Sequence, residues 1–470
     1  MSSPTLSVCQ NTSLTTPNTA SLNLTLRETN WSGNRGDKRT VPPHRKVGDV
    51  VPHPAEQQAS NLSFVRIFST DERGHMNEPY RHDPAPYPAS GGWNPDQPAG
   101  HRQFHQFAQA RPFSLEGGGS LRDVTIAYET WGTLNEDASN AILVCHAWTG
   151  DSHVAGSAGK GHATPGWWEG VVGPGNAIDT NKYFVVCSNV LGGCQGSTGP
   201  ASPHPDDGEP YGLRFPVVTI RDMVRAQASL ADALGINTWR AVVGGSMGGM
   251  QALEWAITFP TRVRALIAVA TCAEASAQQI AWGSIGRRAL LMDPAYQNGD
   301  YYNAGPDGGP WNGFSVARMI AQVTFRTDSK FNEKFGRQLK DQNFNSDGID
   351  LFSRFEVEGY LDHHGDRLVR RFDANSYLYM GKAMDLHDIG RGRGGLEAAL
   401  ARIKAPTLTV SIDSDILYPA YQQELIQSHL TNNDPRNAHK EIQSVEGHDG
   451  FLIEVVAVGR HISDFLTATE

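Results

Sequence analysis

The sequence predicts an α/β protein with a mostly parallel central sheet, and two features of the chain carry this prediction. Short, nearly continuous apolar runs recur along it, and helical patterns separate several of them. Apolar strands that alternate with helices are typical of a parallel sheet covered on both faces. The expected strands are residues 124–131, 141–145, 183–190, 241–243, 263–270, 407–412 and 441–445.

The expected helices divide into those of the core and those of an insertion. Residues 219–234 form the clearest core helix, because apolar residues recur at helical spacing and Thr219 with Asp222 is a pair typical of a helix N-terminus. Between residues 275 and 395 the strand runs stop and helical spacing takes over. We expect a helical cap there, lying over the crevice at the carboxyl edge of the sheet. The cap helices are expected to include 277–292, 316–324 and 376–387, and the two parts of the core are 104–274 and 396–470.

Residues 1–103 differ in composition from the rest of the chain. They are rich in Ser, Thr, Asn, Pro, Gly, Arg and His, and they contain few apolar residues. Such a segment cannot bury enough surface to offset the entropy of ordering its backbone. We therefore expect a disordered N-terminal extension over residues 1–103.

The whole-chain totals exclude several classes of protein. The 470 residues are 39% hydrophobic and carry a formal net charge of −10. An acidic chain without a basic block is not expected to bind nucleic acid, and no run of about 18 apolar residues is present to span a membrane. The first residues do not resemble a secretory signal, and the five cysteines include no C-x-x-C pair. These features predict reduced thiols and a cytoplasmic protein.

The strongest chemical signal is the segment 239–260, WRAVVGGSMGGMQALEWAITFP. It places Gly-x-Ser-x-Gly between an expected strand and an expected helix, the context in which a sharp turn exposes a nucleophile. The glycines two positions either side of Ser246 are expected because strand and helix pass too close for a Cβ. Ser246 is therefore the expected nucleophile, and the N–H of Met247 the expected donor to an oxyanion. The alternative, a plain glycine-rich loop, does not account for the flanking strand and helix.

A serine nucleophile needs a base, and the base needs an acid that orients it. In this architecture the acid and then the histidine follow the serine in the chain. His448 is the expected base, because it follows an expected strand late in the chain and stands beside a glycine. Asp413 and Asp415 both follow the strand 407–412, and spacing alone favours Asp415 without excluding Asp413.

Three further segments are weaker candidates. The loop after residues 141–145 is expected to supply a second oxyanion donor, the backbone N–H of Ala147 or Trp148. The arginines of GRGRGG, residues 390–395, either neutralise coenzyme phosphates or mark the hinge where the cap rejoins the core, and we favour the hinge. Residues 362–366, DHHGD, hold metal-ligand types, but adjacent histidines point apart, so no metal site is expected.

The assembled residues resemble the homoserine O-acyltransferase family, a group with the α/β-hydrolase fold. The resemblance runs from about residue 107 to the C-terminus and covers several specific segments besides the serine turn. These segments are HAWTGDS at 146–152, NVLGGCQGSTGP at 189–200, RFP at 214–216, RFDANSY at 371–377, SDILYP at 414–419 and GHDGFL at 447–452.

The resemblance implies roles that spacing alone does not supply. It identifies Asp415 as the acid, and it matches Arg318 and Asp449 to homoserine-binding positions. A guanidinium suits the α-carboxylate of homoserine and a carboxylate suits its α-ammonium. It further implies a ping-pong reaction through an acyl-serine in methionine biosynthesis, with acyl-CoA as co-substrate and no permanently bound cofactor. A homodimer through the cap helices is implied as well.

The resemblance also bears on the acyl donor. Members that use succinyl-CoA carry Trp-Arg directly after the acid, whereas this chain has Ile416 and Leu417 there and supplies no cation. Acetyl-CoA is therefore the expected donor and L-homoserine the expected acceptor. Serine acylation, succinyl transfer and simple ester hydrolysis remain the alternatives. Trp148 stands where the family usually has leucine, which leaves the shape of the acyl pocket open.

Overall fold

The computed structural model describes residues 85–340 and 353–470, all of which belong to one compact unit. Its centre is an eight-stranded sheet in the order β1-β4-β8-β5-β9-β10-β11-β12. The pairs β1–β4 and β4–β8 are antiparallel, and the other five pairs are parallel. The predicted mostly parallel α/β architecture is thus confirmed. The strands are β1 Gln103–Phe107, β4 Val124–Trp131, β5 Ala141–Cys145, β8 Phe184–Ser188, β9 Ala241–Gly245, β10 Leu266–Val269, β11 Thr407–Ile412 and β12 Ala438–Ile442.

The two edge strands are the ones that the apolar pattern predicted poorly. β1 was not expected, because its sequence QFHQF is polar and mostly exposed. β12 was expected at 441–445 but lies at Ala438–Ile442, where only Ile442 is buried. An edge strand buries little of its surface, so its sequence need not carry a continuous apolar run.

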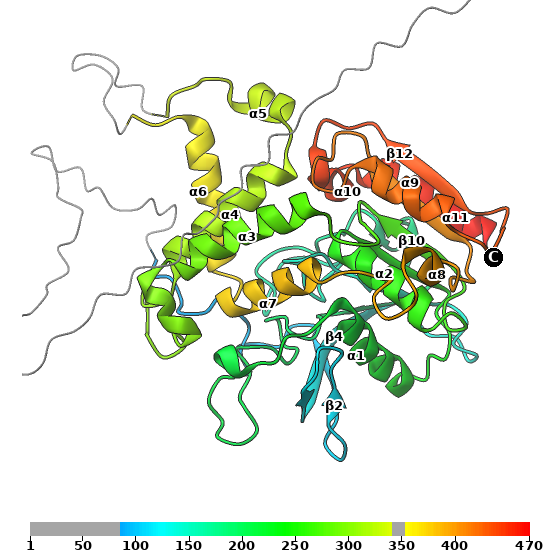
Figure 1. Ribbon diagram of the computed structural model, residues 1–470, viewed down its shortest axis with the longest axis horizontal. Helices are drawn as coiled ribbons and strands as arrows, with labels where there is room; N and C mark the ends of the chain where they lie inside the picture. The colour runs from blue at the N-terminus through cyan, green and yellow to red at the C-terminus, as the bar shows by residue number, and fades with distance from the viewer. Residues whose placement is uncertain (1–84, 341–352) are drawn as a thin grey trace, which may run out of the picture. The chain divides into compact units, whose positions relative to one another are not determined.

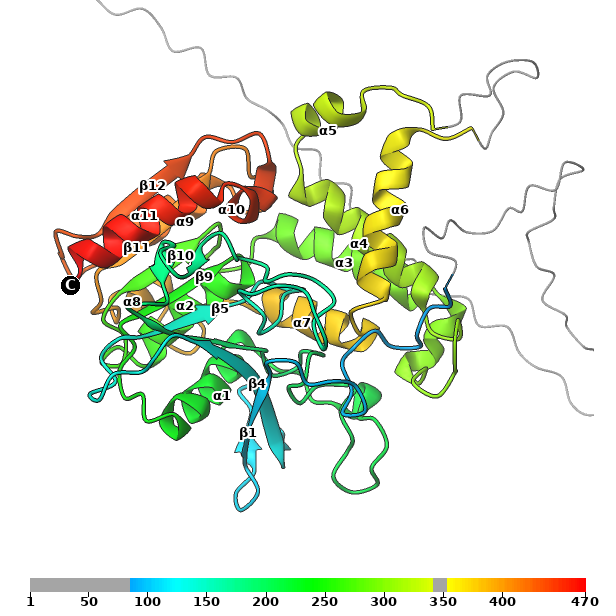
Figure 2. The same cartoon turned by 180° about the vertical axis from the view of Figure 1, so that it is seen from behind.

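Helices cover both faces of the sheet (Figures 1 and 2). On one face, α1 (Ile220–Ala233) and α2 (Met247–Thr258) pack over side chains such as Leu143 and Val242. On the other face, α11 (Val455–Ala468) packs over alternate residues of the same strands, including Val144. Thr219 and Asp222 form the predicted capping box at the start of α1. The remaining helices of the core are α8 Leu396–Leu400, α9 Ala420–Ser428 and α10 Gly450–Ile453.

Of the α-helices that the described residues form between β10 and β11, five (α3 to α7) fall in the range 275–395 where the cap was expected. Of these, α3 packs against α4 and α7, and α4 packs against α6. Figure 1 shows α3 to α6 as a group beside the helices that cover the sheet. The short helix α5 and the helix α6 were not expected. The five helices are α3 Ala277–Leu291, α4 Trp311–Phe325, α5 Asp328–Phe335, α6 Glu356–Val369 and α7 Ala374–Asp385.

The boundary of the N-terminal extension, expected at residue 103, is wrong for residues 85–102. Tyr87 is buried and its ring stacks on Trp311, with 5.0 Å between ring centroids. The backbone N–H of Trp93 donates to the carbonyl of Cys194 at 2.8 Å. These few aromatic contacts fix a segment whose average composition is polar. The rest of the expected extension, residues 1–84, lies outside the described residues.

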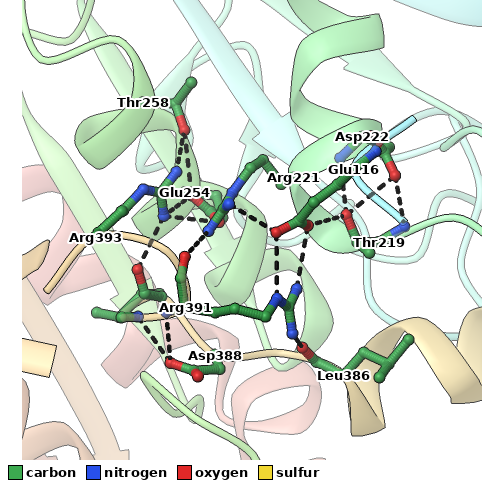
Figure 3. Close-up of polar contacts among 12 residues, drawn as sticks. Glu116, Thr219, Arg221, Asp222, Glu254, Thr258, Leu386, Asp388, Arg391 and Arg393 are labelled. Carbon is green, nitrogen blue, oxygen red and sulfur yellow. Dashed lines mark hydrogen bonds and ion pairs between the residues drawn. The ribbon is translucent and has the colours of Figure 1, made fainter. Parts of the chain in front are cut away.

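The segment that leads from the cap back to the core is held by ion pairs (Figure 3). Arg391 pairs with Glu116 at 3.1 Å, and Arg393 pairs with Glu254 of α2 at 2.8 Å. Arg221 of α1 bridges the same two carboxylates at 2.6 and 3.0 Å. Both arginines of GRGRGG therefore have carboxylate partners, which favours the hinge interpretation over phosphate binding.

Among the helices of the described residues, none combines the length and the apolar character needed to cross a bilayer.

Candidate active site

Ser246 stands at a strained turn between β9 and α2. Its φ is 57° and its ψ is −124°, a combination that L-residues seldom adopt outside functional turns. A Cβ on Gly244 would lie 2.2 Å from the oxygen of Gly248, and a Cβ on Gly248 would lie 2.1 Å from the oxygen of Cys145. Both positions therefore require glycine, as the sequence motif predicted. The carbonyl of Ser246 also accepts a hydrogen bond from the Thr271 hydroxyl at 2.8 Å, which fixes the turn further.

The structure brings Ser246, His448 and Asp415 into one buried hydrogen-bonded chain. His448 Nε2 lies 3.0 Å from Ser246 Oγ, and His448 Nδ1 lies 2.7 Å from Asp415 Oδ2. All three side chains are buried. Because a carboxylate only accepts, the hydrogen is assigned to Nδ1, and Nε2 is left to accept the serine proton.

The turn after β11 distinguishes the two candidate aspartates. Asp415 Oδ1 accepts the backbone N–H groups of Leu417 and Tyr418, each at 2.8 Å, so the carboxylate is held toward His448. Asp413 is exposed and accepts the N–H of Ser444 instead, at 2.9 Å. Only Asp415 reaches the imidazole.

Two backbone N–H groups are available near the serine. Met247 opens α2, where the first amides of a helix have no partner within the helix. Trp148 lies in the loop after β5, and neither its N–H nor that of Met247 donates to another described residue. Both amides remain the candidates for the oxyanion donors that the sequence suggested.

A cavity of about 120 Å³ joins these groups to the cap. Helices α3, α4 and α7 line one side of it, and the serine, the histidine and the loop after β5 line the other. Leu417 faces this cavity, whereas Ile416 does not line it and is half exposed. Of the two residues expected to set donor specificity, only Leu417 is placed to do so.

Arg318 and Asp449 face the same cavity. Within the described residues, the Arg318 guanidinium has no hydrogen-bond or ion-pair partner, and its Cζ lies 5.1 Å from the centre of the Phe325 ring. Burial lowers the pKa of Arg318, and the negative charge of Asp449 opposes that shift. Burial raises the pKa of Asp449, opposed by the charges of Arg326 and Arg318. An unpartnered, partly buried cation beside a carboxylate is suited to a zwitterion.

Sequence reasoning missed a second arginine at this site. Arg326 follows the last residue of α4, and its Nε lies 3.1 Å from Asp449 Oδ2. It also pairs with Glu446, as does Lys330 at 2.9 Å. The signal available in the sequence was the spacing of Arg326 from Arg318, two helical turns later. Arg326 thus pairs with the Asp449 carboxylate, whereas Arg318 has no ion pair among the described residues.

One buried cluster has metal-ligand types, namely Glu129, His153 and His162. His153 Nδ1 bonds Glu129 at 2.9 Å and His162 Nε2 accepts the N–H of His101 at 3.2 Å, whereas His153 Nε2 is buried without a hydrogen-bond partner among the described residues. The imidazoles of His153 and His162 stack 3.8 Å apart at 10°. The in-plane lone pairs of two nearly parallel rings do not converge on one point, so this arrangement of the rings disfavours a shared metal ion.

The aspartates of the DHHGD segment also have partners. Asp362 pairs with Arg354 at 2.5 Å and Asp366 pairs with Arg370 at 3.2 Å. The carboxylates of this segment therefore have a structural role within α6 and its surroundings.

Comparison with known proteins agrees with this geometry. Residues 140–454 match the model of the alpha/beta hydrolase fold family. Homoserine O-acetyltransferase of Thermobifida fusca is 51% identical over 381 residues, which cover 81% of this chain and 98% of that protein. The chain belongs to the homoserine O-acetyltransferase family.

Solved structures related to this family member include both transferases and esterases. Homoserine O-acetyltransferase from Bacillus anthracis is 30% identical, with a TM-score of 0.71 over 78% of this chain and 97% of that one. Esterase E22 is 32% identical, with a TM-score of 0.69 over 78% of this chain and 99% of that one. The fold is therefore shared between proteins named as transferases and proteins named as esterases.

Proposed function

We propose that this acyltransferase moves an acetyl group from acetyl-CoA to the hydroxyl of L-homoserine, in methionine biosynthesis. One observation carries the proposal: the cavity lined by Ser246 and His448 of the triad is also lined by Asp449 and by Arg318, whose guanidinium has no partner among the described residues. Ester hydrolysis requires only the serine, the histidine and the aspartate of the triad. Arg318 and Asp449 match the α-carboxylate and the α-ammonium of an amino-acid acceptor. The names of relatives that share about half of this sequence support the same activity.

In the first half-reaction the serine takes the acetyl group. His448 Nε2 accepts the hydroxyl proton of Ser246 while Oγ attacks the thioester carbonyl carbon. The negative oxygen that forms is stabilised by the N–H groups of Met247 and Trp148. The C–S bond then breaks, and CoA leaves as a thiol with the proton that His448 held. The product of this step is acetyl-Ser246.

In the second half-reaction homoserine removes the acetyl group. Arg318 binds its carboxylate and Asp449 its ammonium, which brings its hydroxyl to His448. His448 accepts the hydroxyl proton, and the oxygen attacks the acetyl carbonyl. The bond to Ser246 Oγ breaks, and the proton returns to Ser246. The cap limits access of water, which would otherwise hydrolyse acetyl-Ser246.

The donor and cofactor assignments rest on the chemistry of the lining. Leu417 presents an apolar side chain to the cavity, with no cation for the second carboxylate of a succinyl group. Acetyl-CoA is therefore the proposed co-substrate. The steps above use only side chains and backbone amides of this chain, so no permanently bound cofactor is proposed.

Esterase activity is the second candidate, because esterase E22 shares the fold at similar identity to the transferase structure. The deciding assay incubates the enzyme with acetyl- or succinyl-CoA and with homoserine or serine, following CoA release and product mass. We expect the fastest turnover with acetyl-CoA and homoserine. CoA release that does not depend on homoserine would instead support the esterase. A Ser246→Ala variant is the control, and it should neither gain the mass of an acetyl group nor transfer one.

We also propose that the protein is a homodimer joined through the cap helices. Several large apolar side chains are exposed on α3, at its end and on α4, and such a patch is typical of an interface. Sedimentation equilibrium at several concentrations should give the dimer mass, and a monomer throughout would contradict the proposal. The exposed residues are Ile280, Ile285, Leu291, Met292, Val316 and Val323.

Cytoplasmic location remains a prediction. The cysteines among the described residues are free thiols, which supports a reducing compartment. Fractionation of the native cells would test it.

A further inference from the structure

Trp148 is fixed against the cap by two contacts with one residue. Its indole stacks on the ring of Tyr377 of α7, with 4.1 Å between centroids and 22° between planes. Its Nε1–H donates to the backbone carbonyl of Tyr377 at 3.3 Å. Tyr377 is itself buried, and its hydroxyl donates to the carbonyl of Ala317 at 3.4 Å. The indole therefore has a defined place, at the junction of the loop after β5 with α7 and α4.

Gly381 provides the space that this indole occupies. It lies one helical turn after Tyr377, and a Cβ built on it would lie 2.9 Å from Cζ2 of Trp148. Carbon atoms of side chains do not approach so closely, so an alanine at 381 would displace the indole. The pair Trp148 and Gly381 is thus complementary in shape, with one residue on the core and the other on the cap.

Trp148, Tyr377 and Gly381 all line the cavity that contains Ser246. The backbone N–H of Trp148 is also one of the two amides proposed to hold the carbonyl oxygen of the acyl group. The side chain of the same residue packs at the edge of the same cavity, so we expect it to face the part of the acyl group that extends from this carbonyl. A large, fixed aromatic ring at that place would restrict the length of the acyl chain.

We propose that Trp148, seated against Gly381, is the wall that restricts the acyl group carried by Ser246 to two carbons. This inference rests on the proposed acyl-serine but not on the identity of the acceptor. It adds to the effect of Leu417, because Leu417 withholds a cation from charged acyl groups whereas Trp148 excludes longer acyl groups of any charge. The substrate class is therefore short, uncharged acyl thioesters and esters.

The test measures acyl-chain selectivity with and without the acceptor. Release of p-nitrophenol from p-nitrophenyl acetate and butyrate gives the selectivity of acylation alone, and acetyl- and butyryl-CoA with homoserine give that of the whole reaction. A pocket discriminates one methylene by about 10- to 200-fold. We therefore expect Trp148→Leu to raise the butyryl-to-acetyl ratio of kcat/KM at least tenfold in both assays. Trp148→Phe keeps a ring against Tyr377 and should shift the ratio less.

Gly381→Ala tests the complementarity. In the native background its Cβ should displace the indole and lower kcat/KM for acetyl donors. In the Trp148→Leu background the smaller side chain leaves room, so the same change should have little effect. Thermal unfolding of each variant separates loss of fold from altered selectivity.

Two results would overturn the inference: an unchanged butyryl-to-acetyl ratio in Trp148→Leu, or an equal effect of Gly381→Ala in both backgrounds. Failure of the native enzyme to acetylate homoserine would be a different result. It would refute the proposed function, while the ester ratios would still decide the role of Trp148.

Discussion

Replacement of Asp415 by asparagine tests the hydrogen-bonded chain from the acid to the serine. In the native protein Oδ1 accepts two backbone N–H groups, from Leu417 and Tyr418, and Oδ2 faces His448. The asparagine oxygen must take the position of Oδ1, because an NH₂ group there would oppose two donors. The NH₂ group then faces His448 Nδ1, which must become an acceptor, so the histidine hydrogen moves to Nε2. Nε2 then points a hydrogen at Ser246 Oγ and cannot accept the serine proton.

The size of the effect follows from this tautomer change. A triad with the histidine hydrogen on the wrong nitrogen loses about 10⁴-fold in kcat. This corresponds to about 5 kcal/mol of transition-state stabilisation, at 1.36 kcal/mol for each factor of ten. The substitution leaves the volume of the buried side chain almost unchanged, so we expect a near-native unfolding temperature.

The assay is CoA release from acetyl-CoA in the presence of homoserine, with circular dichroism as the measure of folding. Asp413→Asn is the matched control, since Asp413 is exposed and contacts the backbone of Ser444 rather than His448. It should retain native turnover. Turnover of Asp415→Asn within tenfold of native, or an equal loss in Asp413→Asn, would refute the assignment of the acid.

Four further outcomes are expected. Gly248→Ala places a Cβ 2.1 Å from the backbone oxygen at the end of β5, so the unfolding free energy should fall by ~1–3 kcal/mol or more; an unchanged urea midpoint would contradict this. Arg318→Leu should raise the KM for homoserine about 10- to 100-fold, from ~1.5–3 kcal/mol for hydrogen bonds to a charged group, while hydrolysis of p-nitrophenyl acetate persists. Burial raises the pKa of Asp449 above its usual 3.8. The carboxylate is therefore present above that raised pKa and lost below it, so the KM for homoserine should increase as pH falls through a value higher than 3.8; a KM that is flat across this range would exclude the role. Arg393→Met removes one of the two arginine partners of the buried Glu254 and should lower the free energy of unfolding in urea by ~1–3 kcal/mol, with a smaller loss at high salt.

The sequence predicted the parts of this protein that are encoded locally. β4, β5 and β11 were expected at their observed bounds, because each is a mostly buried strand rich in apolar and β-branched residues. The turn at Ser246 was predictable because a side chain at either flanking glycine would clash with the backbone. Residues that follow different strands, such as Asp415 and His448, were placed together by the rule that loops converge at the carboxyl edge of a parallel sheet.

The rest depends on contacts between distant segments. The choice between Asp413 and Asp415 required the turn that aims one carboxylate at His448. The pair formed by Arg326 and Asp449 has no spacing signal, since each residue comes from a different part of the chain. The register of the polar edge strand β12 was likewise set by its partner strand rather than by its own pattern.

The position of the cap between β10 and β11 divides this protein into parts that can evolve at different rates. Ser246, Asp415 and His448 follow β9, β11 and β12, outside the inserted helices. Arg318 and Gly381 belong to the insertion. Mutations in the insertion can therefore change which acyl donor or acceptor the cavity binds. The nucleophile and its base lie outside the insertion and keep their positions. If the insertion and the core change independently, one fold can serve both transferases and esterases, as the similarity of this chain to structures of both kinds illustrates.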